Sequence, residues 1–407
     1  MFSDRTIRSL VVVMVLATVM RQVLLSLICA LLLLAIGIAY LWNRWSLVRV
    51  FYERELSQVR AFPGDEIELE IRIENRKPLS LIALEVRDSI PANIELIDHE
   101  LQFEPDGRQV LRRTTSVRWY ERVVCHYRVR CRARGSYRFG PVQLEASDPF
   151  GFYRSHREIG HVTHLLVYPT PLPLDQLGLP SRRPLGELRK QHLIRDPLRT
   201  IGVRDYNHSD PLKDVHWTAT ARVGTMQTRV YEPTNALELA VYLDLSSFDE
   251  PWQGIDEQQV ERLISATTTI IQAAVKDGYA VGLYSNGAQA QFAPLVRLPP
   301  SRSPAQYERM MQTLARMTPY AITPVARLLH TTTNDLAWGA TTLLISATAP
   351  KSAQAMLLRL HDHGRSVIWL YLGEKTPPRL AGVPIHHAPP AQDWRGNGRN
   401  RWAGTAS

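Results

Sequence analysis

The N-terminal part of the chain carries a long run of apolar residues. Val23–Trp42 contains twenty residues and no charge. A helix rises about 1.5 Å per residue, so this run matches the roughly 30 Å hydrocarbon core of a bilayer. Arg44 and Arg49 follow the run, as expected where a helix leaves the membrane. The pattern predicts a transmembrane anchor within residues 1–50.

A shorter apolar run precedes the anchor and leaves its topology open. Ser9–Met20 is separated from the main run by Arg21-Gln22. The two runs form either one long helix or a hairpin whose first helix is short. Arg5 and Arg8 lie before the first run, and further arginines follow the second. A hairpin places all of these charges in the cytoplasm, as the positive-inside rule requires, so we favour it, with a cytoplasmic body.

From Phe62 onward, within a predicted domain of residues 54–170, apolar residues recur at every second position. Glu66–Glu74 alternates charged and apolar residues, as a half-buried strand does. Further strand candidates are Leu81–Arg87, Ile94–Ile97, Gln109–Arg118 and Glu121–Arg134. Short strands at this spacing predict an immunoglobulin-like β-sandwich. The aromatic-rich segments Arg134–Pro141 and Asp148–Tyr153 are expected to be corner motifs whose rings close the end of the sandwich.

From residue 236 to 375, strand patterns alternate with helix patterns. Leu237–Leu243 and Thr341–Ser346 are apolar runs of strand length, and Gln258–Lys276 has helical spacing followed by Gly278. This alternation predicts βαβ units and a mainly parallel α/β sheet. The polar tail, residues 389–407, is expected to be disordered.

Composition narrows the possible partners. The net charge of +9 and the pI near 9.6 indicate an acidic partner or surface: anionic lipid, nucleic acid or an acidic protein face. No basic and aromatic motif of a nucleic-acid-binding protein is present, so we expect no nucleic-acid partner. Cys125 and Cys131 lie in one predicted strand, too far apart for a disulfide, and Cys29 lies in the anchor. This cysteine usage fits a reducing compartment.

Residues 171–235 form a charged connector, and Val203–Glu232 is its densest part. A metal site at His208, Asp210, Asp214 and His216 is one interpretation, although the spacing matches no HExxH motif. Hydrolysis by Ser209 lacks the GxSxG motif, and phosphate binding by Arg204, Lys213 and Arg222 lacks a glycine-rich loop. The structural interpretation is a clasp of paired charges that joins the two domains and presents a partner surface. That surface comprises Arg204, Asp205, Tyr206, Asp210, His216, Trp217 and Arg222.

Several segments together resemble a known bacterial family. RGSYRFGPV, DPFGFY and RDYNHSDPLKDVHWTATAR follow the apolar N-terminus in this order. The chain resembles, from about Arg54 to Leu372, the bacterial family catalogued as domain of unknown function fifty-eight. Family members usually have Pro-Gly-Asp where this chain has His208-Ser209-Asp210. The resemblance implies a von Willebrand factor A-like C-terminal half and a MoxR-type AAA+ ATPase as partner.

The von Willebrand A fold binds a divalent cation through an Asp-x-Ser-x-Ser motif and residues of two further loops. Asp244 and Ser246 match the motif, whereas Phe248 replaces its second serine. Thr323 matches the threonine of the second loop, but the third loop, Ser346–Thr348, has no aspartate. The resemblance therefore implies a degenerate site with no cofactor, and weak Mg²⁺ binding is the alternative.

These observations together predict a non-catalytic protein of the bacterial inner membrane. It is expected to be an adaptor that binds other proteins, with the MoxR-type ATPase, in complex assembly or maturation. Its contact with lipid is through the anchor. The alternative is a metal-dependent hydrolase that uses the cluster from His208 to His216.

Overall fold

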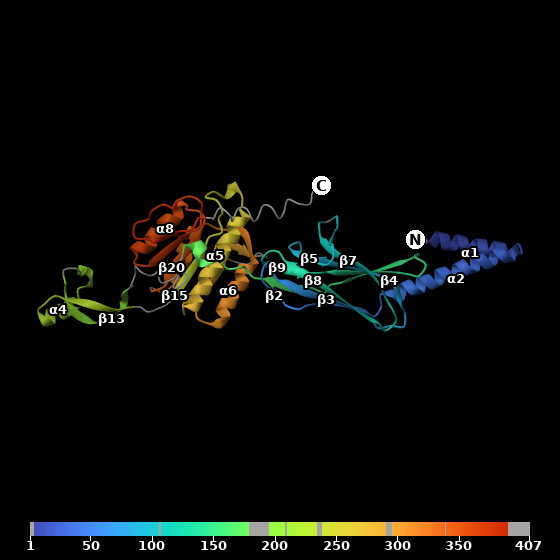
Figure 1. The fold of residues 1–407 in the computed structure, drawn as a ribbon, viewed down its shortest axis with the longest axis horizontal. Helices are drawn as coiled ribbons and strands as arrows, with labels where there is room; N and C mark the ends of the chain where they lie inside the picture. The colour runs from blue at the N-terminus through green and yellow to red at the C-terminus, as the bar shows by residue number, and fades with distance from the viewer. Residues whose placement is uncertain are drawn as a thin grey trace. The chain divides into compact units, whose positions relative to one another are not determined.

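The computed structural model describes residues 4–105, 107–178, 195–207, 210–233, 238–289, 295–337 and 339–389. The chain forms two compact units, Met1–Tyr168 and Pro169–Ser407. In Figure 1 the first unit runs from blue to green and the second from green to red.

Helices α1 (Asp4–Val19) and α2 (Val23–Ser46) open the first unit and pack against each other. They are joined at Arg21, which has a φ of 57°. Among the described residues, α2 is the helix that is long and apolar enough to cross a membrane, with a mean hydropathy of 2.8. By length and composition, α2 fits a membrane anchor or an N-terminal signal sequence.

The remainder of the first unit is all β. Its strands are β1 (Val50–Leu56), β2 (Arg60–Ala61), β3 (Glu66–Asn75), β4 (Leu81–Ile90), β5 (Ile94–Leu96), β6 (Gln102–Phe103), β7 (Gln109–Val117), β8 (Arg122–Cys131), β9 (Gly135–Phe139), β10 (Val142–Ser147), β11 (Arg154–Ile159) and β12 (Thr163–Val167). They form sheets in the orders β1-β3-β8-β5, β11-β10-β4-β7-β6 and β2-β12-β9. The predicted alternation is confirmed in β3, where every second side chain is buried.

A buried ion pair ties this β region together. Arg54 of β1 and Asp88 of β4 bind each other with both side chains fully buried. The Tyr52 hydroxyl donates to Asp88 Oδ2 at 2.7 Å, and Arg54 Nη2 donates to Phe139 O at 2.9 Å and to His161 O at 3.0 Å. Burial raises the pKa of Asp88, and the Arg54 guanidinium opposes that rise. The network joins strands of all three sheets named above, and the apolar core surrounds it.

The second unit begins with the short 3₁₀ helix η1 (Leu174–Leu177) and an antiparallel hairpin of β13 (Arg195–Asp205) and β14 (Gln227–Pro233). The chain between these strands forms the 3₁₀ helix η2 (Leu212–Asp214) and the short helix α4 (Trp217–Val223). We call β13, η2, α4 and β14 the hairpin module.

The α/β sheet of the second unit has the strand order β18-β16-β15-β20-β21-β22. The strands are β15 (Glu238–Leu243), β16 (Ala280–Ser285), β18 (Val296–Ser301), β20 (Thr341–Ser346), β21 (Ser366–Tyr371) and β22 (Ile385–His387). Its helices are α5 (Glu257–Lys276), α6 (Pro304–Arg316), α7 (Val325–Thr332) and α8 (Lys351–Asp362), with η3 (Pro251–Gln253) and η4 (Thr333–Asp335) in connections. A small separate sheet pairs β17 (Gly287–Gln289) with β19 (Met317–Ala321). The predicted alternation of strands and helices is therefore present.

Two strands of this sheet were not predicted. Edge strand β18 is antiparallel to β16, whereas the other neighbouring pairs are parallel. It contains Pro299 and Pro300, which an edge strand tolerates because one side of it needs no hydrogen bonds. Strand β22 adds residues beyond 375 to the opposite edge. The predicted disordered tail lies outside the described residues from position 390 onward.

Candidate functional site

The charged residues predicted as a partner surface lie in the hairpin module, where several stabilise its turns. The Asp210 carboxylate accepts from Arg204 Nη2 at 2.7 Å and from the Asn207 backbone N–H at 2.9 Å. The Tyr206 hydroxyl donates to Asp210 O at 3.1 Å. Asp210 is therefore tied to three residues at the end of β13 and just after it, Arg204, Tyr206 and Asn207. The pairing of Arg204 with Asp210 agrees with the structural interpretation of this stretch.

Asp205 and His216 hold the second half of the module. Gln227 Nε2 of β14 donates to Asp205 Oδ1 at 2.6 Å, and Gln227 is buried. His216 is the N-cap of α4, because its Nδ1 accepts from Ala219 N at 3.1 Å. The lone pair of Nδ1 is thus used within the helix cap, which places the ring proton of neutral His216 on Nε2.

Other side chains of the module face solvent. Trp217 is 68% exposed, Leu212 66% and Val223 63%, and Arg222 is also exposed. Exposed tryptophans and other large apolar side chains are candidates for contact with another protein. The hairpin module thus combines an internally bonded frame with exposed apolar side chains.

The alternative metal or hydrolase cluster is only partly covered by the structure. His208 and Ser209 lie outside the described residues. Within the described parts of the chain, no group of three or more His, Cys, Asp or Glu side chains is placed to hold a metal ion. The clasp between the two units stays a prediction.

A second group of polar residues lies at the carboxyl end of the α/β sheet. The strand order reverses between β15 and β20, and such a switch point is where open α/β sheets bind ligands. Asp244 directly follows β15 there and is 1% exposed. Its Oδ1 accepts from Ser246 N at 3.0 Å and from Asn286 Nδ2 at 2.7 Å. Its Oδ2 is buried and has no hydrogen-bond partner.

Asn286 connects the loops around Asp244. It follows β16 and is fully buried. Its Oδ1 accepts from Leu245 N at 2.9 Å, and its Nδ2 also donates to Thr323 O at 3.0 Å. The Asn286 amide therefore fixes both the orientation of the Asp244 carboxylate and the position of the Thr323 loop.

Two hydroxyl groups near this carboxylate also lack partners. Thr323 Oγ1 and Thr348 Oγ1, like Asp244 Oδ2, are buried without a hydrogen bond. Burial raises the pKa of Asp244, while the hydrogen bonds from Ser246 and Asn286 oppose the rise by favouring the charged form. The Thr348 hydroxyl is close enough to lower this pKa too, although its geometry is not that of a hydrogen bond. Because buried polar atoms are nearly always paired, such oxygens mark a place for water or a cation. We call Asp244, Asn286, Thr323 and Thr348 the switch-point site.

Asp244, Ser246 and Thr323 are the residues of the degenerate cation site that the resemblance implies, and that site stays a prediction. Asp244 and Thr323 were predicted as ligands and contribute unpaired oxygens, whereas Ser246 contributes its backbone N–H to the Asp244 carboxylate. Asn286 and Thr348 were missed as site residues. The signal was their position at the ends of apolar strands, with Asn286 directly after β16 and Thr348 two residues after β20, which places both at the same edge of a parallel sheet.

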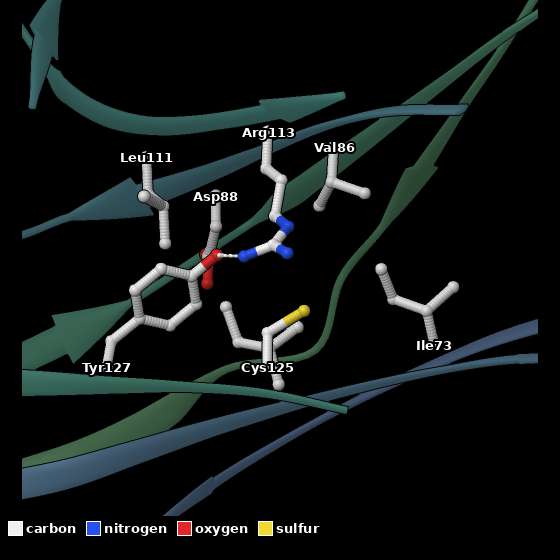
Figure 2. A pocket seen from close by; sticks show the side chains of 8 residues that line it. Ile73, Val86, Asp88, Leu111, Arg113, Cys125 and Tyr127 are labelled. Carbon is white, nitrogen blue, oxygen red and sulfur yellow. Dashed lines mark hydrogen bonds between the residues drawn. The ribbon is translucent and has the colours of Figure 1, made fainter. Parts of the chain in front are cut away.

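The β region of the first unit contains a small cavity (Figure 2). Its volume of about 10 Å³ is roughly that needed for one water molecule. Arg113 Nη1 donates to the Tyr127 hydroxyl at 2.9 Å beside Cys125 (Figure 2). This cavity is far smaller than a substrate pocket, which occupies roughly 300–1,000 Å³.

The structure thus defines an apolar N-terminal helix, an all-β region and an α/β unit with a hairpin module. Residues 202–368, from β13 into β21, match the family described as "Protein of unknown function DUF58". The chain is also 20% identical over 283 residues to "Uncharacterized protein YeaD" of Bacillus subtilis (strain 168). That match covers 67% of this chain and 64% of YeaD, which is less than two thirds of the length of YeaD.

Similarity to solved structures is low. The CARDB domain of the PF1109 protein from Pyrococcus furiosus gives a TM-score of 0.20 at 15% identity, covering 29% of this chain and 86% of that domain. A cohesin module from a Clostridium perfringens family 33 glycoside hydrolase gives 0.22 at 10% identity, covering 29% and 96%. TM-scores this low do not establish a shared fold.

Proposed function

We propose that the protein is a membrane-anchored interaction protein that binds a MoxR-type AAA+ ATPase through the hairpin module. Helix α2 would anchor it in the inner membrane of a bacterium, with both units in the cytoplasm. The partner class comes from the family resemblance, and the match over residues 202–368 includes most of the module and most of the α/β sheet. The work of the complex would be assembly or maturation of other proteins.

The exposure of Trp217 carries this proposal. Binding hot spots in protein interfaces are enriched in tryptophan, because one large ring buries much apolar area at a small entropic cost. Trp217 begins α4 and is 68% exposed, directly after the His216 cap that orders the helix. The polar residues of the module bond mainly with one another, so they would hold this ring in place.

The topology of the α/β sheet supports the proposal that this part of the chain is a von Willebrand A-like domain. Numbered along the chain, its strands have the order 3-2-1-4-5-6, with the third strand antiparallel at an edge. This is the doubly wound order of α/β folds that bind ligands at the switch point. Asp244 at that point agrees with the ligand position implied by the resemblance.

The binding test uses the full chain in lipid nanodiscs and the purified ATPase. We expect Trp217→Ala to weaken binding by about thirty-fold, the effect of losing a hot spot worth roughly 2 kcal/mol. Trp252→Ala is the matched control, because Trp252 is 79% exposed in the same unit but lies outside the module. Equal binding by both variants would refute the module as the contact surface.

We further propose that the switch-point site binds Mg²⁺ weakly. Asp244 Oδ2, Thr323 Oγ1 and Thr348 Oγ1 are oxygen donors of the kind this cation prefers, and all three are buried without partners. A bound cation would supply positive charge for a carboxylate of a partner. Titration calorimetry of the full chain should show Mg²⁺-dependent heat that Asp244→Asn abolishes. An absence of heat from the unaltered chain would rule out this binding.

A further inference from the structure

The end of the β region that joins α2 is built around the last turns of that helix. Lys77 Nζ donates to Ser46 O and, at 3.0 Å, to Val48 O. The Tyr120 N–H in turn donates to Lys77 O at 3.3 Å. The turn Arg118–Glu121 between β7 and β8 is therefore held at the level of the C-terminal end of α2.

A second turn lies alongside α2 itself. Ser155 Oγ bonds to Asn43 O at 2.6 Å, and the rings of Tyr153 and Tyr40 meet edge to face with centroids 6.2 Å apart. Figure 1 shows the connection between β10 and β11, in green, beside the last part of α2. The turn Asp148–Tyr153 thus extends back along the helix toward its N-terminus.

The rise per residue of α2 gives the depth of each contact relative to the hydrocarbon core. Tyr40 precedes Ser46 by six residues, which is about 9 Å along the axis. If Val23–Trp42 fills the hydrocarbon core, Ser46 lies about 6 Å beyond the core, within an interfacial layer of roughly 5–8 Å on each side. Arg118–Glu121 then lies in the headgroup layer, and Tyr153 lies at the edge of the hydrocarbon.

Both turns present aromatic rings outward. Trp119 is 66% exposed, Tyr120 71% and Phe150 49%. The prediction that the Asp148–Tyr153 aromatics close the end of the sandwich is wrong for Phe150, whereas Tyr137 and Phe139 of the other predicted corner are buried. Tryptophan and tyrosine are enriched where membrane proteins cross the lipid interface.

The backbone of the two turns is arranged to display these rings. Tyr120 has a φ of 49°, a left-handed conformation that costs a residue with a side chain roughly 1–2 kcal/mol. Asp148 accepts from the backbone N–H groups of Phe150 at 3.1 Å and Tyr153 at 2.7 Å, which fixes the second turn. A position that favours glycine but carries an exposed tyrosine indicates a function for that ring.

The charge at this end is suited to an acidic surface. Arg44, Arg49, Arg118 and Arg154 are exposed around the two turns. Three carboxylates near the turns are buried or have partners: Asp148 is buried, the Glu121 carboxylate accepts from the Arg118 backbone N–H, and Glu74 forms ion pairs with Arg76 and Arg122. Exposed basic residues next to a membrane helix are attracted to anionic lipid headgroups.

We propose that the turns Arg118–Glu121 and Asp148–Tyr153 insert into the lipid interface beside the end of α2. They dock the β region directly on the membrane, with the arginines on acidic headgroups and Phe150 at the boundary of the acyl chains. The inference rests on the proposed anchoring by α2.

Spin labelling of the full chain in nanodiscs of phosphatidylcholine and phosphatidylglycerol tests this docking. Single cysteines replace Phe150, Trp119, Leu34 of α2 or Phe103, and the accessibility of each label to oxygen and to a water-soluble nickel chelate is compared. The native Cys29, Cys125 and Cys131 are buried, so labelling is directed to the new position. Phe103 is the control, because it is 71% exposed and pairs with Gln109 at the far end of β7.

The labels at 150 and 119 should favour oxygen over the nickel chelate relative to position 103, with 150 closer than 119 to the value at 34. If position 34 lies in lipid while 150 and 119 resemble 103, docking is overturned and anchoring stands. If position 34 is itself exposed to water, the anchor fails and docking fails with it. Circular dichroism of each variant verifies that the fold is retained.

Discussion

Replacing Asp244 by asparagine should stabilise the α/β unit at neutral pH in the absence of divalent cations. The Asp244 carboxylate is 1% exposed, and its Oδ2 is unpaired. Asparagine keeps an oxygen for Ser246 N and Asn286 Nδ2 but removes the buried charge. Its amide nitrogen would face the nearby Thr348 hydroxyl, which can accept a hydrogen bond as well as donate one. Since an unsatisfied buried polar atom costs about 1–3 kcal/mol, we expect a gain of that size.

The gain should depend on pH with a defined sign. Burial raises the pKa of Asp244 in the folded state, so the folded chain binds this proton more tightly than the unfolded chain. The native protein therefore loses stability as pH rises from the unfolded pKa, near 3.8, through the higher folded pKa. The advantage of Asp244→Asn should grow over that interval and then stay constant.

Hydrogen exchange of the amides in β15 and β20 measures this local stability in the full chain. If the site binds Mg²⁺, the cation at ten times its Kd should stabilise the native protein by about 1.4 kcal/mol and leave the variant unchanged. Two results would refute the reasoning. One is that Asp244→Asn is less stable than the unaltered protein at neutral pH without cations. The other is that the difference in stability between the two does not vary with pH. Either would show that the buried Asp244 carboxylate does not destabilise the fold.

Three further predictions concern stability, each measured by urea unfolding of the full chain. Asp88→Asn should lower the free energy of unfolding by about 3–5 kcal/mol, because it leaves the Arg54 guanidinium buried without its charged partner. Asp98→Asn, in an exposed ion pair with Arg128, should lower it by less than about 1 kcal/mol, and equal losses would contradict the prediction. Arg262→Met should lower the free energy of unfolding by about 3 kcal/mol, because its guanidinium donates to Leu372 O, Ala388 O and Pro389 O, of which Leu372 O also accepts from Gln259 Nε2; an unchanged midpoint would contradict this. Tyr120→Gly should stabilise by up to about 1 kcal/mol because it relieves a left-handed φ; a destabilised variant would remove the argument for strain.

The spacing of apolar residues along the chain was sufficient to predict strands and helices that bury one face. The alternation of Glu66–Glu74 appears as β3, and the apolar spacing of Gln258–Lys276 as α5, because one face of each is buried along its whole length. The pattern failed for β18, where Pro299 and Pro300 argue against a strand unless the strand is known to lie at an edge. Edge position is a property of the whole sheet, which local spacing does not contain.

The switch-point site depended on the same non-local information. Asp244 was predicted because a resemblance placed it, while Asn286 and Thr348 become neighbours of Asp244 only through the order of β16, β15 and β20. The burial of the aromatic side chains could likewise not be predicted from the sequences of the segments Arg134–Pro141 and Asp148–Tyr153. Phe139 is buried in β9, which pairs with β12, whereas Phe150 lies in a turn and is 49% exposed. Similar composition thus gave opposite burial.

Photo-crosslinking in living cells tests whether the hairpin module contacts a MoxR-type AAA+ ATPase. A photoreactive amino acid replaces Trp217 of the hairpin module or, as the control, Trp252, in the full chain. We expect the label at 217 to capture a MoxR-type AAA+ ATPase and the label at 252 to capture none. If the ATPase is captured from neither position, or equally from both, then the hairpin module is not its binding surface.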